Sequence, residues 1–178
     1  MTGEPRQFVP VRIAVLTVSD TRGPQDDRSG DVLVARILGA GHVLADRALC
    51  RDDRAEIEAR LRAWIADAGV DVVISTGGTG LTGRDVTVEA HEALYEKAAP
   101  AFGALFAMLS YQKIGPSAVQ SRACAGVAGG TYLFALPGSP SACRDAWDLI
   151  LGPQLDYRTM PCNFVELLPR LEEHKRRK

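Results

Sequence analysis

Apolar and amphipathic segments alternate along the first half of the chain. Arg12 to Val18 and Val72 to Ile74 are apolar on both faces, which predicts strands buried on both sides. His42 to Leu49 predicts a further strand between them. Amphipathic segments from Asp31 to Leu38 and from Arg54 to Ala68 predict the intervening helices. The order is therefore strand, helix, strand, helix, strand.

The second half of the chain begins with helical segments. Residues from Val86 to Glu96 suit a helix, and Pro100 opens another whose apolar stripe contains Phe102 and Phe106. Two strands joined by a Gly129-Gly130 turn follow, and the last predicted helix has Ser139 as N-cap and continues to about Leu151. The two strands are predicted at Arg122 to Ala128 and Thr131 to Leu136.

Helical crossovers imply parallel strands, whereas the glycine hairpin reverses one strand. We therefore predict an α/β fold: a three-layer α/β/α arrangement with a mostly parallel mixed sheet that carries one antiparallel strand. The 178 residues suit a single domain over 1–178, with flexible tails at 1–9 and 170–178. Ser29 and Asp53 are expected to cap the first two helices.

Composition excludes several classes of partner. The 21 basic and 22 acidic residues nearly cancel, so nothing predicts binding to nucleic acid or to an anionic membrane. No apolar run is long enough to span a membrane, and the N-terminus lacks the apolar core of a signal peptide. The four scattered cysteines predict reduced thiols rather than a zinc site or disulfides.

The most informative stretch is the glycine-rich loop after the third strand, Thr76-Gly77-Gly78-Thr79-Gly80. A strand, a glycine loop and a helix together aim backbone N–H groups at an anion, and Asp85 could hold a Mg²⁺ shared with phosphates. The alternative is a tight turn with Asp85 capping the next helix. A P-loop is excluded because no lysine follows, and a dinucleotide fingerprint because no acidic residue lies about 20 residues on.

In a parallel sheet, ligands bind beyond the carboxyl ends of the strands. The polar segments that follow the first, second and third strands should therefore converge: Ser19 to Gly30, Arg51 to Asp53, and Thr76 to Asp85. Asp52 and Asp85 are the best candidate carboxylates, although Asp53 could replace Asp52. Carboxylates, glycine amides and hydroxyls without an evident base suit phosphoryl or nucleotidyl transfer, and the three histidines are interpreted as structural.

Two further segments complete the predicted site. Asp20, Asp26 and Asp27 are expected in a mobile polar loop that could close over a ligand. Ser139, with the amides after Gly138, offers a second helix start that could bind an anion or an amide.

With these residues identified, the chain resembles the MoaB/Mog family of molybdenum cofactor biosynthesis proteins, which includes the gephyrin G domain. The resemblance runs from about Phe8 to Asn163 and its details are closest to the MoaB branch. It is carried by five motifs: Leu16–Asp20, Asp27–Gly30, Thr76–Gly80 with Asp85, Ser121-Arg122, and Leu136–Pro140.

The resemblance implies a cytoplasmic protein, a homotrimer or trimer-based hexamer, and transient contact with other proteins of molybdenum cofactor biosynthesis. It also implies binding of molybdopterin and Mg-ATP, with transfer of AMP to the terminal phosphate of molybdopterin. Asp85 and Asp52 would then be catalytic and would hold Mg²⁺. The binding residues would be Ser19, Asp20, Thr76, Gly77, Gly78, Thr79, Gly80, Pro137, Gly138, Ser139 and Ser141.

Two other functions remain open from the sequence. One is a molybdopterin carrier or scaffold without turnover, and the other is a phosphohydrolase of the kind found among CinA-type proteins. The sequence shows no extra domain of the kind found in CinA-type proteins, so we expect the transferase or the carrier rather than the phosphohydrolase.

Overall fold

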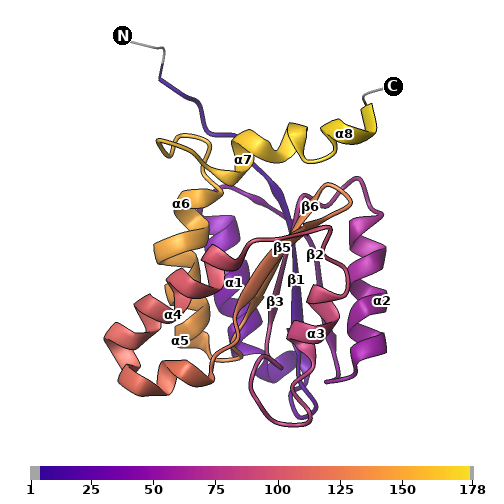
Figure 1. Cartoon of the computed structure of the whole chain (residues 1–178), viewed down its shortest axis with the longest axis vertical. Coiled ribbons are helices and arrows are strands. Elements are labelled where there is room, and N and C mark those ends of the chain that lie inside the picture. The colour runs from indigo at the N-terminus through magenta and orange to yellow at the C-terminus, as the bar shows by residue number, and fades with distance from the viewer. Residues whose placement is uncertain (1–4, 177–178) are drawn as a thin grey trace.

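The computed structural model describes residues 5–176, and within them six strands form one sheet in the order β2-β1-β3-β6-β5-β4 (Figure 1). β1, β2, β3 and β6 run parallel, and β5 runs antiparallel to both of its neighbours. The strands are β1 (Arg12–Val18), β2 (Val43–Cys50), β3 (Val72–Thr76), β4 (Lys97–Ala98), β5 (Cys124–Ala128) and β6 (Thr131–Leu136).

Helices cover both faces of the sheet, with α1, α4 and α5 on one face and α2 and α3 on the other (Figure 1). The helices of the described chain are α1 (Arg28–Gly39), α2 (Arg54–Ile65), α3 (Thr87–Glu92), α4 (Pro100–Ile114), α5 (Pro140–Ala146), α6 (Gly152–Gln154), α7 (Phe164–Leu167) and α8 (Glu173–Arg176). The predicted three-layer α/β/α fold with a mostly parallel mixed sheet is therefore confirmed.

Alternate side chains of the central strands supply two separate cores. Ile13 and Val15 of β1 belong to the core beneath α1 and α5, whereas Leu16 belongs to the core beneath α2. Burial of each such side chain contributes roughly 1.5–3 kcal/mol, so both faces hold the central strands in register. This is why the predicted bounds of β1 and β6 match the observed ones.

The start of α1 differs from its prediction. Its N-cap is Asp27, whose carboxylate accepts a hydrogen bond from Gly30 N at 2.9 Å, so the prediction of Ser29 as cap was wrong. Asp27 is 2% exposed and also accepts from Thr17 Oγ1, and it pairs with Arg47 at 2.7 Å. It was predicted to lie in a mobile polar loop, but these three partners fix it in the protein interior.

The helix after the glycine loop is shorter than predicted. It ends at Glu92, and the chain then forms β4 on the edge of the sheet instead of continuing as a helix to Glu96. Glu96 N donates to Val127 O at 2.8 Å and Ala99 N donates to Ala125 O at 2.7 Å. Pairing with β5 therefore replaces the helical hydrogen bonds.

The remaining elements agree closely with expectation. Asp53 caps α2 and Ser139 caps α5, each by accepting a hydrogen bond from a backbone N–H of the first turn. Beyond Ala146 the helix continues as a π-helical turn, Trp147–Leu151. The predicted flexible tails remain a prediction, and residues 1–4 and 177–178 lie outside the described residues. No helix within the described part is both long and apolar enough to cross a membrane.

Candidate functional site

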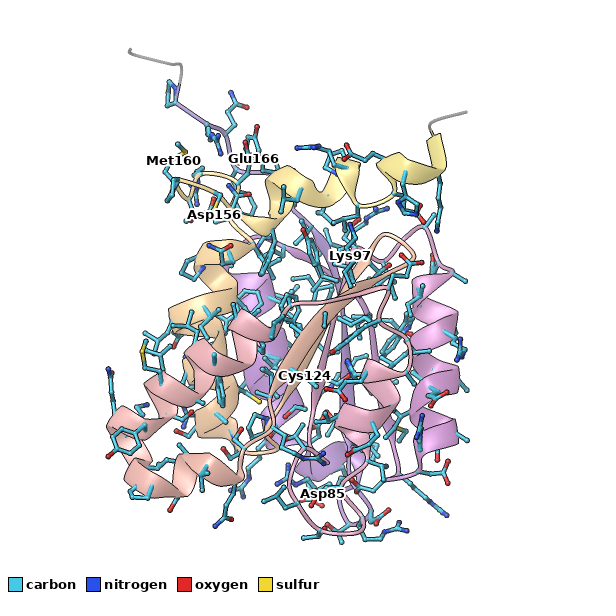
Figure 2. The ribbon with its side chains drawn as sticks, in the orientation of Figure 1. Asp85, Lys97, Cys124, Asp156, Met160 and Glu166 are labelled. Carbon is cyan, nitrogen blue, oxygen red and sulfur yellow. The ribbon has the colours of Figure 1, made fainter. Side chains whose placement is uncertain are left out.

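The carboxyl ends of β1, β2, β3 and β6 meet at one edge of the sheet. Figure 2 shows Asp85 at this edge, in the loop that connects β3 to α3. Thr76 Oγ1 donates to Pro137 O at 2.9 Å, and a Cβ placed on Gly138 would lie 3.1 Å from the Cα of Gly77. The glycine loop and the Pro137–Ser141 turn are therefore in direct contact, as the topology predicts.

The ends of β1 and β2 are joined by a pair of reciprocal hydrogen bonds. Asp20 N donates to Asp52 Oδ2 at 3.0 Å, and Asp52 N donates to Asp20 Oδ1 at 3.1 Å. Arg84, which follows the glycine loop, donates to Asp20 Oδ2 at 2.6 and 2.8 Å. Three of the predicted strand-end segments thus form one cluster.

The glycine loop runs between the two candidate carboxylates. A Cβ on Gly78 would lie 2.6 Å from Asp52 Oδ1 and closer still to Thr87 Oγ1, and a Cβ on Gly80 would lie 2.7 Å from Asp85 Oδ2. Gly78 also has a φ of 64°, which disfavours other residues. Glycine is therefore required here because both carboxylates approach the loop backbone closely.

Asp85 is bound within its own loop and does not cap α3. Its Oδ2 accepts hydrogen bonds from Thr82 N at 2.9 Å and Thr82 Oγ1 at 2.7 Å, and Val86 occupies the N-cap position of α3 without a side-chain cap. Burial raises the pKa of Asp85, but the bonds from Thr82, a backbone bond from Gly80 and the charge of Arg122 together hold it below its ordinary value. The carboxylate is therefore ionised and oriented before any ligand binds.

Asp52 is in a less favourable environment. Burial raises its pKa above the ordinary value, the charge of Asp20 adds to this effect, and Asp85 contributes further. Asp53, the alternative left open by the sequence, accepts from Glu56 N at 2.9 Å and so caps α2. Asp52 is thus the residue of this pair that faces the glycine loop.

The hydroxyl groups of the predicted site are partly engaged. Ser19 Oγ accepts from Arg22 N at 3.1 Å, and Ser139 Oγ accepts from Ala142 N at 3.1 Å. Thr76 and Thr79 are buried in the loop, whereas Ser141 is exposed on the first turn of α5. The predicted residues follow the ends of β1, β2, β3 and β6, and β1 and β3 separate β6, which precedes Ser139 and Ser141, from β2, which precedes Asp52.

The donor set of this edge suits a Mg²⁺ that shares its ligands with phosphate. Within residues 5–176, no three His, Cys, Asp or Glu side chains are grouped so as to hold a metal ion by themselves. However, Mg²⁺ is commonly bound through one or two carboxylates and substrate phosphates. Thr87 Oγ1 lies beside Asp52 and Gly78 and is a buried polar atom without a hydrogen-bond partner. The residues present therefore fit a Mg²⁺ that is shared with phosphate.

Several residues of this edge were not predicted from the sequence to shape the site. Arg22 Nη1 donates to Gly138 O at 3.0 Å, and Ser29 Oγ donates to the same oxygen at 2.9 Å. Arg122 donates to carbonyl groups of the glycine loop. Their partners are backbone oxygens far along the chain, so no local pattern could have identified them.

A separate cavity of about 790 Å³ lies elsewhere, beside β4 and the C-terminal helices. Its lining includes Lys97, which Figure 2 shows near the end of the molecule opposite Asp85, together with Tyr132 and Phe164. This largely apolar cavity has no glycine loop or paired carboxylates. The candidate site is therefore the polar edge that carries Asp52, Asp85 and the glycine loop rather than this cavity.

Comparison with known proteins supports one family. The sequence model described as "Probable molybdopterin binding domain" matches residues 14–157. Molybdenum cofactor biosynthesis protein B of Escherichia coli (strain K12) is 51% identical over 158 residues, which cover 89% of this chain and 93% of that protein. The protein of the same name from Bacillus subtilis (strain 168) is 40% identical over 146 residues, which cover 82% of this chain and 86% of that one.

Solved structures agree with these sequence matches. A crystal structure of molybdenum cofactor biosynthesis protein B has a TM-score of 0.83 and 37% identity, covering 96% of this chain and 99% of that chain. The tungsten cofactor synthesizing protein MoaB from Pyrococcus furiosus has a TM-score of 0.73 and 34% identity, covering 80% and 91%. The chain therefore belongs to the molybdenum cofactor biosynthesis protein B family.

Proposed function

We propose that this protein binds molybdopterin and transfers AMP from Mg-ATP to the terminal phosphate of molybdopterin. The observation that carries the proposal is the placement of Asp52 and Asp85 against the same glycine loop. An oxygen of the molybdopterin phosphate attacks the α-phosphorus of ATP, the bond to the β-phosphate breaks, and pyrophosphate leaves. The nucleophile is already anionic, so the reaction needs no histidine base.

The nucleotide half of the site is formed by the glycine loop and its two carboxylates. Gly77 N donates to Leu136 O at 3.0 Å, so the loop amides that would bind phosphate oxygens are those from Gly78 onward. Asp52 and Asp85 would hold Mg²⁺. Bound Mg²⁺ neutralises phosphate charge and favours in-line displacement at the α-phosphorus. Asp85 is ionised, and Thr82 holds its carboxylate in one orientation through Oδ2.

The pterin half of the site is the turn Pro137–Ser141 together with Ser19 and Asp20. Gly138 contacts Gly77, which brings a ligand on this turn next to the phosphate-binding amides. Arg22 and Ser29 both donate to Gly138 O and fix the turn. A molecule with a pterin at one end and a phosphate at the other can therefore span both halves.

Catalysis is tested by incubating the protein with molybdopterin, ATP and MgCl₂. We expect pyrophosphate release in equal amount to a molybdopterin–AMP conjugate, identified by mass spectrometry. The second candidate function is a molybdopterin carrier without turnover, and the engagement of Asp85 Oδ2 by Thr82 favours it because this oxygen is already in use. Tight molybdopterin binding without pyrophosphate release would establish the carrier and contradict the transferase.

Self-association is part of the proposal. Four large apolar side chains of α4, each at least 39% exposed, lack cover from the rest of the described chain: Leu105, Met108, Tyr111 and Ile114. Their exposure supports self-association with α4 at a subunit contact, and the resemblance to the MoaB/Mog family implies a homotrimer or a trimer-based hexamer. Light scattering should give a trimer or hexamer, and M108E with Y111E should shift it towards monomer while V43E does not. A monomeric wild-type protein would contradict this part.

A further inference from the structure

Arg122 bridges the two ends of the turn that carries Asp85. Its Nε donates to Gly80 O at 2.8 Å, and its Nη2 donates to Asp85 O at 3.3 Å. These carbonyls belong to the first and last residues of the segment 80–85. Arg122 lies just before β5, whose first residue Cys124 is labelled in Figure 2. The side chain of Arg122, just before β5, thus binds both ends of a loop that is more than 35 residues away in sequence.

The guanidinium group is itself held in place by α3. Arg122 Nη1 pairs with Glu89 Oε1, and Nη2 lies 3.4 Å from Glu89 Oε2. This bond to Glu89 is the main reason that the pKa of Arg122 is raised, and Arg122 in turn lowers the pKa of Glu89. Arginine suits this position because its planar fork spreads donors over three nitrogens, which here reach two carbonyls and a carboxylate, whereas a lysine donates from a single nitrogen.

The loop is therefore fixed from two sides. From within, the Asp85 carboxylate accepts hydrogen bonds from Thr82, and from outside Arg122 binds the flanking carbonyls. The Arg122 and Glu89 side chains are 27% and 41% exposed, so their ion pair contributes little to global stability. The contacts of Arg122 thus affect the shape of the loop more than the stability of the fold.

We infer that Arg122 is a positioning residue that fixes the segment 80–85 so that the Asp85 carboxylate remains against Gly80. This inference rests on the proposed function, in which Asp85 holds Mg²⁺, but Arg122 itself does not touch a substrate in that proposal. Because a displacement of about 1 Å can reduce a rate by about 10²-fold, a loosened loop should reduce catalysis.

The test compares R122K and R122Q with the matched control E89Q. E89Q removes the charge of the ion pair, but the amide oxygen of the glutamine can still accept a hydrogen bond from the guanidinium, which keeps its bonds to both carbonyls. In R122K we expect kcat for pyrophosphate release to fall by about 10²-fold, while KM for Mg-ATP changes less. The kcat of R122Q should fall at least as far as that of R122K. The kcat of E89Q should fall by less than about threefold, as expected for a surface ion pair.

Hydrogen exchange provides a readout that does not depend on turnover. The amides of residues 79–86 should exchange faster in R122K than in E89Q. The exchange rates of β1 and β3 and the melting temperature should be the same in the two variants. Unchanged loop exchange in R122K would overturn the inference, as would faster exchange throughout the sheet. If the wild-type protein releases no pyrophosphate, the proposed function fails, and loop exchange alone decides the role of Arg122.

Discussion

The end of β2 and the loop after β3 each place one carboxylate against the same glycine backbone. The pKa values of these two carboxylates are shifted in opposite directions. Asp85 receives two hydrogen bonds from Thr82, which keep its pKa below the ordinary value despite partial burial. Asp52 is buried beside the charge of Asp20, and its pKa is raised. The ionised form of Asp85 is stabilised by its own loop, whereas the ionised form of Asp52 would be stabilised most by a bound cation.

This difference assigns separate contributions to the two residues. A group whose pKa is lowered by folding stabilises the protein above its unfolded pKa, and this contribution is lost as the pH falls through the folded pKa. A group whose pKa is raised contributes stability only at low pH and loses it as the pH rises. At neutral pH, Asp85 therefore favours the folded protein and ionised Asp52 opposes it, so Asp52 is retained at a cost in stability.

The largest expected effect comes from D85N. The amide can still accept a hydrogen bond from Thr82, so the fold should persist, but the charge that holds Mg²⁺ is lost. We expect pyrophosphate release to fall by about 10²–10³-fold, the range found when one preorganised electrostatic contact is removed. Asp67, an exposed residue at the other end of β3 from the glycine loop, provides the matched control, since D67N should retain wild-type activity. Full activity in D85N would remove Asp85 from the mechanism.

The next effect tests the space between the carboxylates. G78A would introduce a Cβ against Asp52 and Thr87 at a positive φ, and we expect it to destabilise the protein by about 1–3 kcal/mol. Activity should fall as well because Asp52 must move. G83A is the control, since nothing lies within 4 Å of its Cβ position and its φ is not positive. Equal melting temperatures for both variants would show that Asp52 does not approach the loop this closely.

A smaller effect should appear in the pH dependence of the Mg²⁺ requirement. Because the pKa of Asp52 is raised, protons compete with Mg²⁺ at a higher pH than at an ordinary carboxylate. The Mg²⁺ concentration for half-maximal pyrophosphate release should therefore rise as the pH falls. D20N removes the neighbouring charge, lowers the pKa of Asp52 and should shift this rise to lower pH. A shift to higher pH in D20N would contradict the assigned cause.

The strands were predictable because their signal is local. Arg12–Val18 and Thr131–Leu136 are apolar throughout, and both matched their observed bounds. β4 was missed because Lys97–Ala98 has only two residues and no apolar pattern, so it forms only because β5 is there to pair with it. An edge strand of this kind is determined by tertiary pairing rather than by its own sequence.

The candidate site shows the same division between local and distant causes. Topology alone placed the ends of β1, β2 and β3 together, and the glycine spacing indicated the loop. The position of Asp27 could not be predicted, because its interior location depends on Thr17 and Arg47. Arg122 could be noted only as part of a motif, since its partners are backbone carbonyls of a distant loop.

The most direct test measures the melting temperature of the wild-type protein and of D52N, each with and without Mg-ATP. Without ligand, D52N should melt at the same temperature as wild type or higher, because the unfavourable ionised carboxylate is gone. With Mg-ATP the wild-type protein should be stabilised more than D52N, because the ligand's cation compensates the charge of Asp52. A D52N protein that melts lower without ligand and shows the full wild-type shift with it would contradict the role assigned to Asp52.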